Sequence, residues 1–191
     1  MAKKLLKPQT FLIPLPALMI SCQQGDQRPN IVTASWVGIC CSEPPMLSLA
    51  LRKSRYSHSL IEKSGEFVAN LTTEDLYMVT DFCGMVSGKD VDKFKETQLT
   101  PIKGTKVNAP LIKECPINME CEVRKVIELG SHDLFIGEIV AVHADPDYLD
   151  ENDCPDLNKF KPLIYCTKVQ EYWGGLCVRL GKYGLSKKKK D

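Results

Sequence analysis

The sequence predicts a mainly β protein, a Greek-key barrel with helices on its outside. About six or seven short apolar or alternating runs, separated by Gly, Pro, Asn and Asp, are typical of strands. Helix start and stop signals are few. The 191 residues are 43% hydrophobic and 26% charged, which suits one globular domain with a sizeable core. We therefore expect a single domain over 1–191, with its core at about 12–173 and a C-terminal extension, 174–191, that ends in lysines.

Four runs in the first half of the chain predict strands. Residues 17–22 are apolar and precede a turn-rich stretch. Residues 31–41, IVTASWVGICC, are β-branched and aromatic and predict one strand, which Gly38 weakens near its end. Residues 46–51 and 66–71 predict the next two strands.

Two helices are expected between and after these strands. The first begins at Ser54 or Ser57 and ends near Gly65. The second covers residues 74–84, and a threonine at 72–73 is placed to cap it.

Periodicity fails over residues 84–116, which predicts ordered loop with a short helix or two. Residues 117–129 then alternate cleanly, apolar on one face and polar on the other, and Lys125 breaks the apolar face once. A hairpin turn follows at 130–133. Residues 134–144 are apolar on both faces, so both are expected to be covered, the second by another subunit. Residues 162–175 predict a further strand and an aromatic patch.

Composition excludes several function classes. With 25 Lys+Arg against 24 Asp+Glu, the chain lacks the overall basic charge of a nucleic-acid groove. Nine cysteines without a C-x-x-C spacing are typical of reduced thiols in a cytoplasmic protein rather than disulfides or a metal site. The apolar start resembles a lipoprotein leader, but Pro14 and Pro16 interrupt it before Cys22, which favours an entry loop. No apolar run has the length to cross a membrane.

Residues 52–58, RKSRYSH, combine cations and hydroxyls without an acid at a strand-to-helix junction. Helix N-termini and arginines bind phosphate, so this stretch predicts a phosphate site, or equally a solvated helix start with a serine cap. In NIVTASWVG, Ala34 and Ser35 would let the backbone approach a planar ligand and Trp36 would cover its ring. These residues alone favour a core strand with a buried Trp.

Other residues carry weaker signals. Lys89 lies in a glycine-containing loop and would reach a phosphate, or would belong to an ordinary surface loop. His132 is typical of a turn and His143 of a strand end. The absence of G-x-G-x-x-G and of a P-loop from the sequence argues against a dinucleotide fold.

Four stretches in order, a P-x-P before the first strand, residues 30–71, SGKDVDKF and HDLFIGEIVAVH, resemble the flavin reductase-like, FMN-binding split-barrel family. The resemblance covers about residues 12–173 and is nearest to the flavoredoxin branch. It implies a homodimeric split barrel with one non-covalent FMN per subunit near the dimer interface. It also implies these cofactor contacts: Thr33, Ala34, Ser35 and Trp36 at the ring, Arg52, Ser54, Arg55 and Ser57 at the phosphate, Asn70 near the ribityl chain, and Lys89 and Phe94 from a loop.

The resemblance further implies that the chemistry occurs on FMN, with no catalytic side chain and no metal. We expect a flavin reductase or flavoredoxin-type oxidoreductase that moves electrons between NAD(P)H or a donor protein and flavin or a redox partner. The alternative is a non-enzymatic FMN electron carrier. A small nucleic-acid-binding barrel is least favoured, because the repeated surface aromatics that stack on bases are missing.

Overall fold

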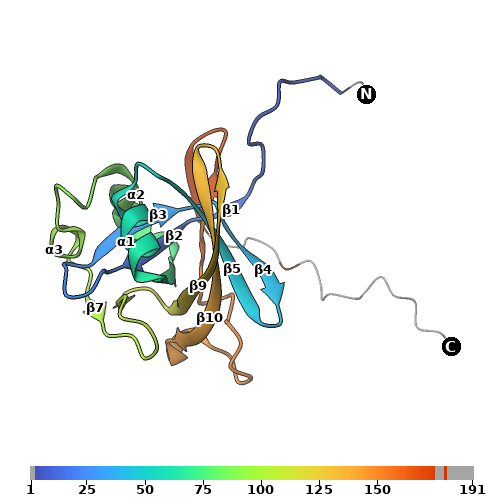
Figure 1. Ribbon diagram of the computed structural model, residues 1–191. Coiled ribbons are helices and arrows are strands. Elements are labelled where there is room, and N and C mark those ends of the chain that lie inside the picture. The colour runs from blue at the N-terminus through green and yellow to red at the C-terminus, as the bar shows by residue number, and fades with distance from the viewer. Residues whose placement is uncertain (1–2, 175–178, 180–191) are drawn as a thin grey trace.

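A seven-stranded antiparallel sheet forms the body of the protein in the computed structural model, which describes residues 3–174 and 179. Its strand order is β3-β2-β6-β9-β10-β5-β4 (Figure 1). The strands are β2 (Leu18–Cys22), β3 (Asn30–Ala34), β4 (Val37–Ser42), β5 (Pro45–Arg52), β6 (Glu66–Leu71), β9 (Ile117–Leu129) and β10 (His132–Ala144).

The sheet curls into a barrel because its two edge strands are consecutive in the chain. Only Ser35 and Trp36 separate β3, at one edge, from β4, at the other. The Ala50 amide donates to the Trp36 carbonyl at 2.9 Å and links this junction to β5. The predicted mainly β split barrel is therefore confirmed, but the single strand predicted over 31–41 is wrong. The bend at Ser35 and Trp36 divides it into two strands.

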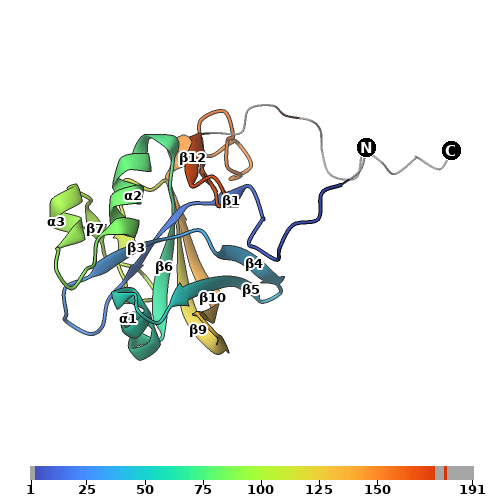
Figure 2. The same cartoon turned by 90° about the horizontal axis from the view of Figure 1, so that it is seen from above.

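Helices and small sheets surround the barrel. The helices are α1 (Tyr56–Ser64), the 3₁₀ turn η1 (Glu74–Leu76), α2 (Tyr77–Met85), α3 (Lys93–Thr97) and the 3₁₀ turn η2 (Pro146–Tyr148). Short strands form two further sheets, β1 (Leu15–Pro16) with β11 (Leu163–Cys166) and β12 (Glu171–Gly174), and β7 (Pro101–Ile102) with β8 (Leu111–Ile112). Figure 2 shows α2 and β12 on one side of β3 and α1 on the other. Among the described residues, no helix has the length and apolar character needed to span a bilayer.

The end of α1 follows the expected signal, but the helix starts do not: α1 begins at Tyr56, between the two serines predicted to start it, and the helix predicted over 74–84 is divided into η1 and α2. Helix α1 ends where predicted, at Gly65, whose φ of 72° is left-handed and whose amide donates to the Ile61 carbonyl. Thr73 occupies the N-cap position of η1, but its side chain makes no capping hydrogen bond. The Thr72 hydroxyl instead donates to the Ala17 carbonyl at 2.5 Å and joins this segment to the barrel.

A β-bulge explains the break in alternation along β9. Against β10, Lys125 pairs with Ile136 and Val123 pairs with Gly137, so Arg124 has no partner of its own. One extra residue exchanges the two faces of the strand. Val123 and Lys125 therefore point to opposite faces of the sheet, so Lys125 does not enter the apolar face.

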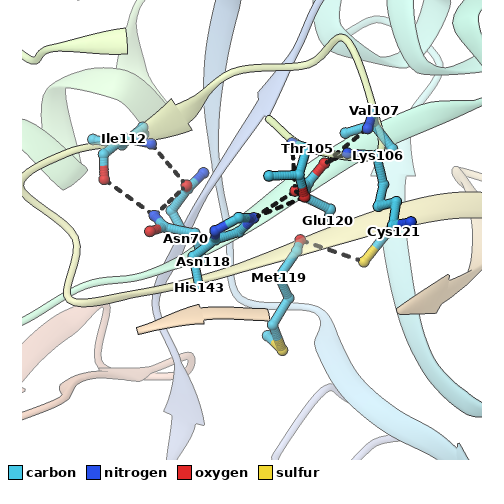
Figure 3. Close-up of polar contacts among 10 residues, drawn as sticks. All are labelled: Asn70, Thr105, Lys106, Val107, Ile112, Asn118, Met119, Glu120, Cys121 and His143. Atoms are coloured by element: carbon cyan, nitrogen blue, oxygen red, sulfur yellow. Dashed lines mark hydrogen bonds and ion pairs between the residues drawn. The ribbon is translucent and has the colours of Figure 1, made fainter. Parts of the chain in front are cut away.

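The first part of the polar face of β9, at Asn118 and Glu120, is buried, because Glu120 holds an irregular loop on the barrel (Figure 3). Glu120, with 0% exposure, accepts hydrogen bonds from the amides of Thr105, Lys106 and Val107 at 2.7–2.9 Å. His143 Nε2 lies 2.5 Å from Glu120 Oε1. The loop in turn covers part of the outer face of β10, where a cluster of Val68, Val107, Ala109 and Leu111 packs against Val140.

Candidate functional site

A cavity of about 820 Å³ opens beside β3. This volume lies near the upper end of the range of about 300–1,000 Å³ that is usual for ligand pockets. The cavity is lined by residues of β3, the β5–α1 junction, α2, the start of β10 and the β11–β12 hairpin: Val32, Thr33, Ala34, Ser35, Trp36, Ala50, Leu51, Arg52, Ser54, Arg55, Asp81, Gly84, Met85, His132, Tyr165, Gln170 and Tyr172.

One wall of the cavity is cationic. Arg52 ends β5, and Ser54 and Arg55 follow it before α1 begins at Tyr56. The first turn of this nine-residue helix holds no acidic residue, and the side chain at its N-cap position, Arg55, makes no capping hydrogen bond. The amides at the start of α1 and two guanidinium groups together form a donor set that suits a phosphate.

A second wall is aromatic. The rings of Trp36 and His132 stack with centroids 6.1 Å apart and planes at 20°. The register of β10 against β5 places His132 opposite Arg52. Burial, and then the nearby charge of Arg52, lower the pKa of His132, which favours its neutral form. His132 was expected to be only a turn residue. Its place beside Trp36 depends on the pairing of β4 and β10 with the two sides of β5, which no local sequence signal reveals.

The β3 wall is held against α2. The Thr33 hydroxyl donates to the Thr80 carbonyl. A Cβ built on Gly84 would lie 3.2 Å from Thr33 Cβ, a tight contact, so the close approach of the helix favours a glycine there. This contact fixes Thr33, Ala34 and Ser35 along the cavity.

The far end of the cavity is formed by residues that the sequence did not indicate. Asp81 and Met85 come from α2, and Tyr165 and Tyr172 from the β11–β12 hairpin. The two tyrosine rings lie 5.3 Å apart. Burial, followed by the charge of Asp81, raises the pKa of Tyr172. Its phenol therefore remains protonated and able to donate a hydrogen bond.

A smaller cavity of about 70 Å³ adjoins the cationic wall and shares Ser54 and Arg55 with it. Ser57 and Lys93 line this cavity. Lys93 is 3% exposed, and its Nζ donates to the carbonyls of Ile31 and Cys83 at 2.6 and 2.7 Å. Desolvation lowers its pKa to about 8.

Lys89 was the lysine expected to contact the cofactor from this loop. In the structure Lys89 is exposed, and Lys93 is the lysine that lines the smaller cavity. The apolar residues Val91 and Phe94 on either side of Lys93 are the sequence feature that could have indicated its burial.

Eleven residues were expected to bind a cofactor, and the structure brings most of them together. Thr33, Ala34, Ser35, Trp36, Arg52, Ser54 and Arg55 line the large cavity and Ser57 the small one, whereas Asn70, Lys89 and Phe94 line neither.

Asn70 is fully buried in a protein network instead. Its Nδ2 donates to the Met19 carbonyl at 2.9 Å, and its Oδ1 accepts from Ile112 N and Asn118 Nδ2 (Figure 3). Phe94 belongs to a core cluster with Met19 and Ile31.

Residues 10–174 match the family model described as flavin reductase like domain. The chain belongs to this family. The structure resembles the flavoredoxin of Desulfovibrio vulgaris (Miyazaki F), with a TM-score of 0.91, 35% identity, and coverage of 97% of this chain and 99% of that one. It also resembles the flavoredoxin from Methanosarcina acetivorans, with a TM-score of 0.88, 30% identity and 97% coverage of both chains. An uncharacterized protein of Archaeoglobus fulgidus is 39% identical over 148 residues, 78% of this chain and 81% of the relative.

Membership of the flavin reductase-like family, in its flavoredoxin branch, gives the protein a flavin-related redox function. The cavity fits a flavin on its own chemistry. It offers a cationic wall for a phosphate and a stacked Trp36–His132 pair for a planar ring. Its β3 wall ends in the small residues Ala34 and Ser35, beside which a ring edge can approach the backbone.

Proposed function

We propose that this protein binds one FMN per chain, non-covalently, in the large cavity. The observation that carries the proposal is the cationic wall, where Arg52, Ser54 and Arg55 meet the N-terminus of α1 without a capping side chain. Arginine recognises phosphate oxygens through charge-assisted hydrogen bonds. In this arrangement the ring lies along Thr33, Ala34 and Ser35, and the phosphate lies at the β5–α1 junction.

Bound FMN supplies hydride or single-electron transfer, and the side chains bind, orient and shield it. Trp36 and His132 cover the ring region. An electron donor or acceptor would occupy the part of the same cavity that is lined by Asp81 and Tyr172. Absorbance of the purified protein tests the proposal. Flavin bands are expected, and their absence even after soaking with FMN would refute it.

Two roles are consistent with this site. The first is an oxidoreductase that takes electrons from NAD(P)H, and the second is an electron carrier that keeps its FMN and serves a redox partner. Steady oxidation of NADH or NADPH by the loaded protein would identify the enzyme, and slow single-turnover reduction would identify the carrier.

We also propose a homodimer. The loop held by Glu120 covers Val140 on the outer face of β10, but Val142 stays 60% exposed. Ile39 on β4 is 66% exposed. A second copy would cover such apolar surface. Light scattering at micromolar protein should give twice the chain mass of 21.4 kDa, and a monomer that still binds FMN would contradict the dimer alone.

A further inference from the structure

One buried carboxylate lies directly behind the cationic wall. Asp133, on β10, is 3% exposed and pairs in register with Leu51, the neighbour of Arg52. Side chains alternate along a strand, so His132 faces the cavity and Asp133 faces the opposite side, toward α1. Asp133 is therefore close to the phosphate-binding stretch but does not line the cavity.

Asp133 contacts both ends of the segment that carries Ser54 and Arg55. Its Oδ2 lies 2.7 Å from His58 Nε2, in the first turns of α1. Its Oδ1 lies 3.5 Å from Lys53 Nζ, in the residue before Ser54. One carboxylate thus fixes the segment on the N-terminal and on the C-terminal side of the two cavity residues.

The α1 end of this arrangement is rigid. The His58 ring is 5% exposed and packs edge-on against Phe135, with centroids 5.1 Å apart. Asp133 Oδ1, by contrast, accepts no hydrogen bond from the described residues. Oδ1 has only its ion pair with Lys53 at 3.5 Å, and a buried carboxylate oxygen without a hydrogen bond is costly, so packing alone does not explain an aspartate at this position.

We propose that Asp133 is a positioning residue for the cofactor phosphate, which it orients through Lys53 and His58 without touching it. The inference rests on the proposed FMN site. A binding constellation must be held to within a fraction of an ångström by the residues behind it. Loss of Asp133 should therefore loosen the segment of Ser54 and Arg55 and weaken phosphate binding specifically.

The test compares FMN with riboflavin, which lacks the phosphate, by titration calorimetry on the full chain stripped of flavin. Asp133→Asn keeps the shape of the side chain but removes its charge. We expect FMN affinity to fall about tenfold, the lower end of the loss seen when residues that support metal ligands are removed, and riboflavin affinity to stay unchanged. Glu120→Gln is the matched control, because Glu120 is an equally buried carboxylate that holds residues 105–107 away from the cavity. It should leave the FMN-to-riboflavin affinity ratio unchanged.

A milder pair of variants covers the case in which Asp133→Asn does not fold. Lys53 is half exposed and does not line the cavity, so Lys53→Gln removes one end of the arrangement in a folded protein. Glu128→Gln removes only the exposed partner of Lys53, 3.3 Å away. Selective loss of FMN in Lys53→Gln but not in Glu128→Gln supports the inference.

The inference is overturned if Asp133→Asn leaves the FMN-to-riboflavin affinity ratio unchanged. If Asp133→Asn does not fold, an unchanged ratio in Lys53→Gln overturns it. An equal change of the ratio in the matched control also overturns it. Wild-type protein that binds neither ligand overturns the FMN proposal itself, which is a separate result.

Discussion

Trp36 and His132 form a stacked pair although 96 positions separate them, and they meet because β4 and β10 both pair with β5, one on each side of it. Trp36 lies at the bend between those strands, and His132 begins β10 opposite Arg52. The pair therefore joins the aromatic wall of the cavity to its cationic wall. These two walls should make separable contributions to binding, one to the flavin ring and one to the phosphate.

Trp36→Leu tests the aromatic wall. Removal of the indole should weaken FMN and riboflavin alike, by about three- to tenfold, because both carry the same ring. Titration of each flavin measures the two affinities. Trp173→Leu is the control, since Trp173 is also exposed but does not line the cavity. A loss confined to FMN would contradict the assignment of Trp36 to the ring.

Arg55→Ala tests the cationic wall. Loss of a charge-assisted contact should weaken FMN by about 1.5–3 kcal/mol, or one to two decades in dissociation constant, and leave riboflavin unchanged. Arg124→Ala is the matched control, because Arg124 pairs with Glu122 and Glu138 away from the cavity. Equal loss of both flavins would indicate general damage, and no loss of either would refute the phosphate role.

Local signals in the sequence predicted the helices and strands. The residues of the site, by contrast, are brought together by contacts between segments that are distant in sequence. Gly65 ended α1 as expected because a left-handed C-cap is a local requirement. Trp36 and Arg55 line the cavity, and both lie at local features of the chain, a turn and a helix start. Lys93 and Asp133 were missed because their burial is created by strands and helices distant in sequence.

Asn70 shows the reverse case. The family resemblance implied a contact with the ribityl chain, whereas in the structure Ile112 and Asn118 donate to its oxygen, and nothing in the sequence EFVAN indicates that network.

Gly88→Ala should disturb the small cavity. A Cβ at Gly88 would lie 1.9 Å from Asn30 Oδ1, and Asn30 Nδ2 donates to Ser57 Oγ at 2.7 Å. Overpacking of this kind should cost about 1–3 kcal/mol of unfolding free energy, and displacement of Ser57 should also weaken FMN. Urea unfolding and FMN titration measure the two effects. Gly38→Ala, whose Cβ would meet nothing nearer than 3.9 Å, is the control and should fold with unchanged affinity.

Glu120 offers a prediction about acid stability. Burial alone would raise its pKa, but hydrogen bonds from Thr105, His143, Lys106 and Val107 outweigh burial and lower the pKa from 4.5 to about 2. A carboxyl whose pKa is lower in the folded state stabilises that state above its unfolded pKa. The contribution of Glu120 is therefore complete above about pH 4.5 and is lost as the pH falls toward 2.

Glu120→Gln should accordingly lower the unfolding free energy by about 3 kcal/mol at pH 7, with a difference from wild type that shrinks as the pH falls from 4.5 to 2. Urea unfolding across this range measures that difference. Glu122→Gln is the matched control, because Glu122 lies on the same strand but pairs with Arg124 in partial exposure; surface pairs contribute little, so its effect should stay below about 1 kcal/mol. A difference for Glu120→Gln that stays constant from pH 7 to pH 2 would show that the lost interaction is not the ionised carboxylate. In that case the loop at 105–107 would be held by packing against Val140 rather than by charge.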